Sequence, residues 1–141
     1  MAAGPEQNLW KSLKATLPRG TFTQRIENRA GSGVPDVYLV LDGQSLFLEL
    51  KVGKVSQFAP RPSQLAWNAS HSLSGGLSAF LLRDASTSCL FLFSALYGLP
   101  RELRKNHVSS STDRDPRLPM WEGELRDVVE GLRTTVLAPR S

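Results

Sequence analysis

The sequence has few of the residues that disulfide frameworks, zinc sites and serine–histidine catalysis require. Its 141 residues include one cysteine, Cys89, which excludes an internal disulfide, fits a reducing compartment and suits a small buried hydrophobe. The two histidines, His71 and His107, show neither zinc-ligand spacing nor a neighbouring nucleophile elbow. No Gly-rich phosphate-binding fingerprint followed by Lys and Ser or Thr is present, which argues against nucleotide hydrolysis and a nucleotide cofactor.

Signals for membrane insertion are missing as well. No apolar run approaches the roughly 20 residues that cross a bilayer, and the N-terminus lacks the basic and then apolar layout of a signal peptide. We therefore expect a soluble cytoplasmic protein, in the host cytoplasm if a phage encodes it. Seventeen Lys and Arg residues against thirteen Asp and Glu residues give a formal charge of +4, which favours a polyanionic partner such as nucleic acid.

The hydrophobic pattern predicts one α/β domain over residues 1–141, with a mixed central sheet and helices on its faces. The part of the domain that carries the motifs spans about residues 6–96, and the C-terminal extension has an exposed loop over 108–119 and a helix over about 121–133. The remaining predicted elements are a helix over 6–17, a strand over 21–28, a hairpin over 37–51, a helix from Pro62 or Ser63 to before Gly75, and strands over 77–82 and 89–93.

The hairpin carries charge at its open end. Two strand-like runs flank an Asp42-Gly43 step, which is a strong hairpin signal. Because side chains alternate along a strand, Glu49 and Lys51 share one face. Asp36 stands at the start of the partner strand, where antiparallel pairing brings it close to Glu49. Two carboxylates and an ammonium therefore converge at one end of a mostly apolar hairpin.

The helix before the hairpin contributes a further acid. Glu6 lies three and four residues before Leu9 and Trp10, on the apolar stripe of its helix. An acid in the first turn is equally explained by the helix macrodipole. Glu6 is therefore either part of the site or a helix-stabilising residue.

The helix after the hairpin offers a polar stripe. We expect its core face to carry Leu65, Ala69 and Leu73, with Gln64, Asn68 and His71 beside that face at positions i, i+4 and i+7. An ordinary solvated helix surface explains His71. Gln64 is the more informative member, because it lies in the first turn and close in sequence to the strand that carries Glu49 and Lys51.

This set of residues suits a divalent cation. Carboxylates at close quarters repel one another and need a cation or a shared proton. Oxygen ligands with positions left for water and phosphate match the preferences of Mg²⁺, which polarises phosphate and lowers the pKa of bound water. Lys51, on the same face as Glu49, is placed to orient that water or to stabilise charge that develops on the phosphate. The residues thus point to metal-dependent phosphodiester hydrolysis.

The motifs also resemble a known family. Pro35-Asp36, a hairpin and then Glu49-Leu50-Lys51 is similar to the PD-(D/E)XK nuclease signature. With the helix that contains Glu6, the segment 31–36 and the stretch 62–67, the pattern resembles the VRR-NUC branch and the phage and archaeal Holliday junction resolvases. The match covers about residues 6–84, so it assigns no role to the C-terminal helix.

The resemblance implies a restriction-endonuclease-like core with Mg²⁺, or Mn²⁺ in its place, as cofactor. It implies that Asp36, Glu49 and the backbone carbonyl of Leu50 bind the metal and that Lys51 is the catalytic lysine. Gln64 would match the glutamine that supports the site, and Glu6 the acid from the first helix. Glu27 competes with Glu6 for that last role, because it shares a strand face with Arg25 near the loop.

Three functions are compatible with this pattern. The first is a structure-selective DNA endonuclease that acts on Holliday or other branched junctions as a homodimer, because family members that cut branched DNA are usually dimers. The second is a nuclease of the same fold that nicks or trims ordinary duplex or single-stranded DNA. The third is a catalytically silent nucleic-acid-binding module, against which the intact set of Asp36, Glu49 and Lys51 argues.

Overall fold

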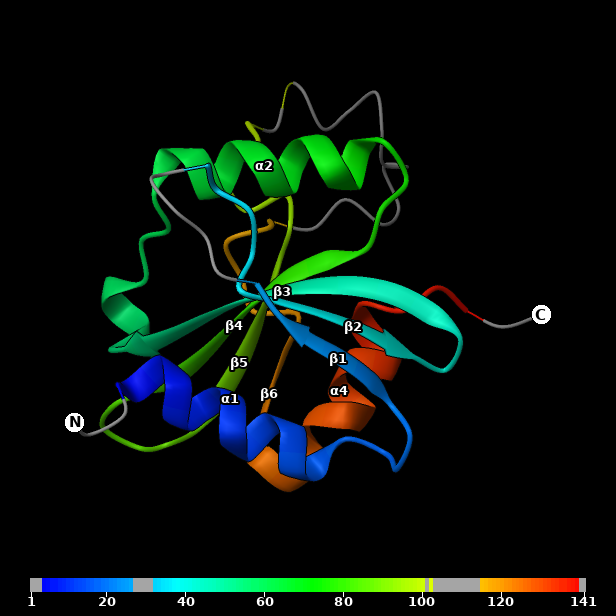
Figure 1. The fold of residues 1–141 in the computed structure, drawn as a ribbon. Coiled ribbons are helices and arrows are strands. Elements are labelled where there is room, and N and C mark those ends of the chain that lie inside the picture. The colour runs from blue at the N-terminus through cyan, green and yellow to red at the C-terminus, as the bar shows by residue number, and fades with distance from the viewer. Residues whose placement is uncertain (1–3, 27–31, 101, 103–114, 140–141) are drawn as a thin grey trace.

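A mixed six-stranded β-sheet forms the centre of the part of the chain that the structure describes (Figure 1). This computed structural model describes residues 4–26, 32–100, 102 and 115–139. The parallel pair β3–β4 lies in the middle of the sheet, and the other neighbouring strands are antiparallel. In spatial order the strands are β1 (Phe22–Arg25), β2 (Val37–Leu41), β3 (Gln44–Gly53), β4 (Ser78–Asp84), β5 (Leu90–Ser94) and β6 (Trp121–Gly123).

Helices cover both faces of this sheet. α1 (Pro5–Thr16) and α4 (Val128–Thr135) lie on one face, and α2 (Pro62–Leu73) lies on the other (Figure 1). The crossover that joins the parallel strands β3 and β4 runs through the short 3-10 turn η1 (Val55–Gln57) and then α2. The predicted α/β class, a mixed sheet flanked by helices, is confirmed. No helix within the described ranges is long and apolar enough to cross a membrane.

The β2–β3 hairpin forms where the sequence predicts it. Leu41 pairs with Gln44, so Asp42 and Gly43 make a two-residue turn. Their φ angles are 54° and 76°, the left-handed conformation that an Asp-Gly step adopts in hairpin turns. The tight turn fixes the register of the two strands, and the register decides which side chains of β3 face α1 and which face α2.

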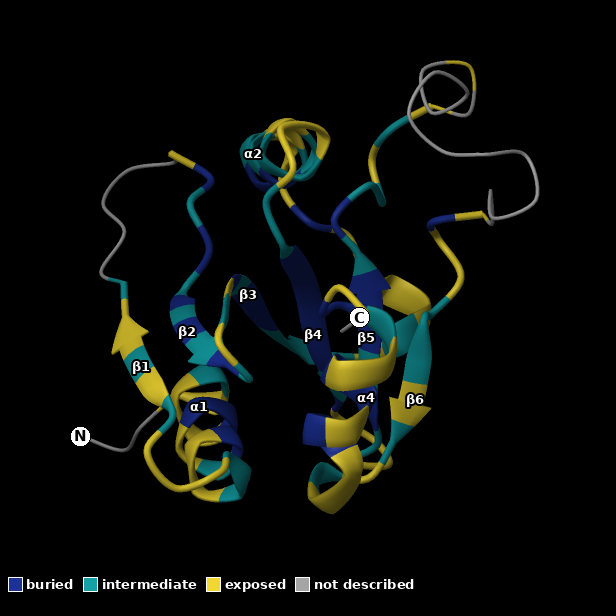
Figure 2. Cartoon of the chain, turned by 90° about the vertical axis from the view of Figure 1, so that its right-hand side faces the viewer, coloured by how far each residue is buried: buried dark blue, intermediate teal, exposed yellow. Residues whose placement is uncertain are grey.

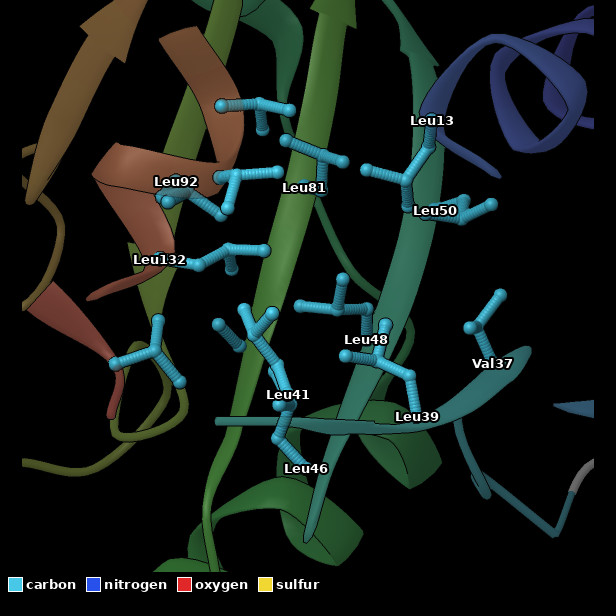
Figure 3. Close-up of a cluster of buried hydrophobic side chains, with 14 of the residues drawn as sticks. Leu13, Val37, Leu39, Leu41, Leu46, Leu48, Leu50, Leu81, Leu92 and Leu132 are labelled. Atoms are coloured by element: carbon cyan, nitrogen blue, oxygen red, sulfur yellow. The ribbon is translucent and has the colours of Figure 1, made fainter. Parts of the chain in front are cut away.

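The larger core lies between the sheet and the helices α1 and α4. Leu48 and Leu50 of β3 point into it; Leu13 of α1 lies beside Leu50, and Leu132 of α4 lies beside Leu92 of β5 (Figure 3). These side chains are at most 1% exposed. Because strand side chains alternate, burial of Leu48 and Leu50 on this face directs Glu49 and Lys51 to the α2 face. The main core therefore orients the charged residues of β3.

The face of α2 that packs on the sheet differs from the predicted one. Leu65 and Ala69 are only half-buried and Leu73 is 38% exposed, whereas Gln64 and Asn68 are almost completely buried. The prediction holds for Leu65, which packs against the buried cluster of Phe80, Leu82 and Phe93, and it is wrong for the exposed Leu73. It also missed that Gln64 turns toward the sheet, where it binds the charged Glu49 of β3. The fully buried residues of α2 are therefore two amides that form hydrogen bonds, Gln64 and Asn68, which hydrophobic periodicity does not reveal.

The predicted helix over 121–133 was also wrong at its start. Trp121–Gly123 form the edge strand β6 on β5, with Trp121 opposite Leu92. The turn η2 (Leu125–Asp127) and then α4 follow. Aromatic residues favour strands, and β5 presents an edge to pair with, so a strand forms here. Residues 27–28 of the predicted first strand and 108–114 of the predicted loop lie outside the described residues.

The C-terminal segment is fastened to the hairpin turn. Arg133 donates two hydrogen bonds to the carboxylate of Asp42, at 2.8 and 3.1 Å. The side chain of Gln44 donates to the Ala138 carbonyl and accepts from the Ala138 N–H, at 3.1 and 2.8 Å. The extension after residue 120 thus completes one edge of the sheet and holds the turn at the far end of the hairpin from Asp36.

Candidate active site

The candidate site lies where β3 runs past the end of β2. The pairing of the two strands begins at Val37 and Leu48, so the next residues of β3 have β4 on one side and the segment that leads into β2 on the other. Asp36 closes this gap. Its Oδ2 accepts a hydrogen bond from the Leu50 N–H at 3.0 Å. The hairpin register thus places the Asp36 carboxylate beside the strand segment that carries Glu49 and Lys51.

Glu49 is the buried member of the set. Its Oε1 accepts a hydrogen bond from Gln64 Nε2 at 2.5 Å and lies 3.8 Å from Lys51 Nζ. The Glu49 residue is 4% exposed, and its Oε2 is buried with no hydrogen-bond partner among the described residues. A buried carboxylate oxygen without a donor is costly, which makes this atom the one that a bound cation would relieve.

The protonation of Glu49 reflects this environment. Burial, and secondly the nearby Asp36 carboxylate, raise the pKa of Glu49 from 4.5 to about 7. The Lys51 ammonium, the Asp36 backbone N–H and Arg61 lower the pKa but do not offset those effects. Near neutral pH the carboxyl is therefore divided between its acid and its anion, and a divalent cation would favour the anion.

Gln64 is held from both sides. Its Oε1 accepts a hydrogen bond from the Arg61 N–H at 2.9 Å, while its Nε2 donates to Glu49. Asn68, one turn later, donates from Nδ2 to the Gln64 carbonyl at 2.8 Å. The first turn of α2 thus fixes the amide that holds Glu49. The sequence pointed to Gln64, but the contributions of Arg61 and Asn68 were missed, although Asn68 stands at helical spacing from Gln64.

The backbone carbonyl of Leu50 faces the same gap. In a β-strand the N–H and C=O of one residue point to the same neighbouring strand. Since the Leu50 N–H points to Asp36, its carbonyl oxygen lies on that side too. This oxygen, the Asp36 carboxylate and Glu49 Oε2 are hard oxygen donors, and these residues fit a Mg²⁺ ion.

A tight backbone contact sets the position of the segment before Asp36. Gly33 has a φ of +80°, and a Cβ atom there would lie 2.1 Å from the Ser63 carbonyl oxygen at the start of α2. Only glycine suits both the left-handed backbone and this contact. Pro35 follows and is buried. The segment that carries Asp36 is thus pressed against the first turn of α2, next to Gln64.

The third predicted acid is placed differently. Glu6 lies in the first turn of α1, half-exposed, on a helix that packs on the sheet face opposite α2. In the described ranges, no group of three or more His, Cys, Asp or Glu side chains is arranged to hold a metal. The structure therefore unites Asp36, Glu49, Lys51 and Gln64 without Glu6. Glu27 lies outside the described residues, so the role of either acid stays a prediction.

Comparisons with known proteins show a likeness of fold to solved structures. No protein-family model and no curated protein matches the chain. Among solved structures, it is similar to Hjc, a Holliday junction resolvase from the archaeal hyperthermophile Archaeoglobus fulgidus. The two share 15% sequence identity with a TM-score of 0.49, over 64% of this chain and 74% of that chain.

Proposed function

We propose that the protein is a metal-dependent DNA endonuclease of the PD-(D/E)XK class that hydrolyses phosphodiester bonds. One observation carries the proposal: Asp36 and the orphaned carboxylate oxygen of Glu49 converge beside Lys51 at the open end of the hairpin. The order Pro35-Asp36 and Glu49-Leu50-Lys51 is the motif of that class. The formal charge of +4 favours a nucleic acid as substrate.

Asp36, Glu49 and the Leu50 carbonyl would hold Mg²⁺, or Mn²⁺ in its place. The ion would supply a polarised phosphate and a bound water of lowered pKa. Gln64 holds Oε1 of Glu49, which leaves Oε2 directed away from the amide for a ligand. Hydrolysis adds water across the P–O bond and gives a phosphomonoester and a hydroxyl group. Lys51, with its side chain 27% exposed, stabilises the negative charge that builds up on the phosphate.

Branched DNA is the substrate we favour, and a homodimer is the assembly that would pair two sites across a junction. The same site would serve a nuclease without preference for DNA shape, or, without catalysis, a DNA-binding module. A cleavage assay with Mg²⁺ on a four-way junction, a flap, a plain duplex and a single strand separates these functions. We expect the junction or flap to be cut fastest. Equal rates on all four would refute selectivity, and no cleavage of any would refute the nuclease.

A further inference from the structure

A row of aromatic rings crosses the α2 face of the sheet and begins at its edge strand. The ring centroids of Phe22 and Tyr38 are 6.0 Å apart, and those of Tyr38 and Phe47 are 5.1 Å apart. Phe47 in turn lies 5.2 Å from both Trp67 and His71 of α2, which stack on each other at 4.7 Å. Tyr38 lies two residues after Asp36 and Phe47 two residues before Glu49, so the row adjoins the candidate site.

This row is only partly covered. Phe22 is 55% exposed, and the other four rings are half-buried rather than buried. On this face, α2 packs mainly on β4. The residues of β1, at the edge of the sheet, are mostly exposed (Figure 2). Among the described residues, no helix covers this face over β1 and β2. A row of rings with this exposure is available to a ligand.

A groove of about 600 Å³ adjoins the row where it reaches α2. It is lined by Ser32 and by a stripe of α2 that includes Ser63, Ala66, Trp67 and Ser70. Its size falls within the range of pockets that hold small organic groups. Its described lining carries no Asp, Glu, Lys or Arg, and burial lowers the pKa of His71, which disfavours the charged imidazolium. The groove is therefore suited to a flat, uncharged group.

The groove begins beside the candidate site. Ser32 lies four residues before Asp36, and Ser63 precedes Gln64, the amide that binds Glu49. The cations on the site side are Lys51 and the exposed Arg61, whose charge acts on Glu49. If the phosphate groups of a single DNA strand lay along Lys51 and Arg61, the bases of that strand would lie toward the groove and the aromatic row.

We propose that this groove and the aromatic row bind unpaired nucleotides of the DNA strand next to the scissile phosphate, with a base stacked on Trp67. The inference rests on the proposed nuclease function and narrows its substrate to DNA with a single-stranded part beside the cut, such as a flap, fork or open branch. Bases of a closed duplex are stacked on one another and cannot reach the rings. Stacking on aromatic side chains holds single strands whatever their sequence.

Binding without metal and without cleavage tests this proposal. Fluorescence anisotropy in EDTA compares a forked DNA with a blunt duplex of the same length. We expect Trp67→Ala to weaken binding of the fork by about 5- to 100-fold, the range of one base stack, and binding of the blunt duplex by less than about 3-fold. Trp67→Phe keeps a ring and should retain the affinity for the fork. Equal weakening on both DNAs would overturn the proposal.

Tryptophan fluorescence reports stacking directly. Trp10 is 8% exposed in the core, and Trp121 lies on β6 at the other edge of the sheet. A fork with an unpaired thymidine tail should therefore quench the emission of Trp67, and Trp67→Phe should remove that quenching while the fork still binds. Quenching that persists in Trp67→Phe would show that the bases stack elsewhere and would overturn the proposal.

A matched pair of charge variants avoids changes to packed rings. Ala66→Glu puts a negative charge into the groove, and Ala15→Glu puts the same charge on an exposed position of α1, on the opposite face. We expect only Ala66→Glu to weaken binding of the fork. If Ala66→Glu instead abolished self-association in sedimentation and left fork binding intact, the surface would belong to a second copy, and the proposal would fail. Absence of cleavage with intact fork binding would contradict the nuclease function alone.

Discussion

Replacement of Glu49 by glutamine should stabilise the metal-free protein at alkaline pH and leave its stability at acid pH unchanged. Glutamine has the shape of the protonated carboxyl and can still accept the hydrogen bond from Gln64. It removes the anion that burial and the Asp36 carboxylate disfavour. The variant thus isolates the electrostatic cost of the site from its packing.

The size and sign of the effect follow from the pKa of Glu49. The pKa rises from 4.5 in the unfolded chain to about 7 in the folded protein. The folded state therefore binds the proton more tightly, and stability falls as pH rises from about 4.5 through 7. Above pH 7 the full cost of the anion is present, on the order of 3 kcal/mol. The variant should exceed the wild type by this amount at pH 8 and match it near pH 4.

Urea unfolding in EDTA at several pH values measures the difference. Glu122→Gln, at an exposed position of β6, serves as a control for the loss of a carboxylate. The difference between the Glu49→Gln variant and the wild type should grow steadily between pH 4 and pH 8. A difference that did not change with pH, or one that matched that of the control, would show that Glu49 is not held in a costly environment.

Three further predictions concern the surroundings of the site. Gly33→Ala should destabilise the protein by roughly 1–3 kcal/mol and lower cleavage, because a Cβ at φ +80° meets the Ser63 carbonyl; unchanged urea midpoints would contradict this. Glu6→Gln should reduce cleavage more than Glu27→Gln does, and the reverse order in the same assay would identify Glu27 as the third acid. Arg133→Ala should cost about 1 kcal/mol or less, because its ion pair with the hairpin turn is partly solvated, and a large loss in thermal unfolding would refute that.

The hairpin and its charged end followed directly from the sequence. An Asp-Gly step fixes a two-residue turn, the turn fixes the register, and the register decides that Glu49 and Lys51 share a face. Gln64 was also placed correctly at the start of its helix, since Pro62 marks where that helix begins. These features depend on local backbone geometry, which short sequence motifs predict well.

Features that depend on packing between distant segments could not be predicted in this way. The side of α2 that faces the sheet depends on the charge beneath it, so Gln64 and Asn68, predicted to lie beside the core face, are the residues that are fully buried. Trp121 becomes part of a strand because β5 offers an unpaired edge, and no local signal marks that edge. Glu6 lies in the first turn of α1, but helical spacing alone could not show that α1 packs on the sheet face opposite α2.

The most direct test of the central claim is the rate at which forked DNA is cut in Mg²⁺ by the wild type, Asp36→Asn and Asp127→Asn. Asp127 is an exposed aspartate in η2, so its variant controls for the loss of one carboxylate. We predict that Asp36→Asn lowers the rate by more than about 100-fold, while Asp127→Asn cuts at the wild-type rate. Both variants should have the same thermal unfolding midpoint as the wild type. Cleavage at the wild-type rate by Asp36→Asn would contradict the assignment of this site.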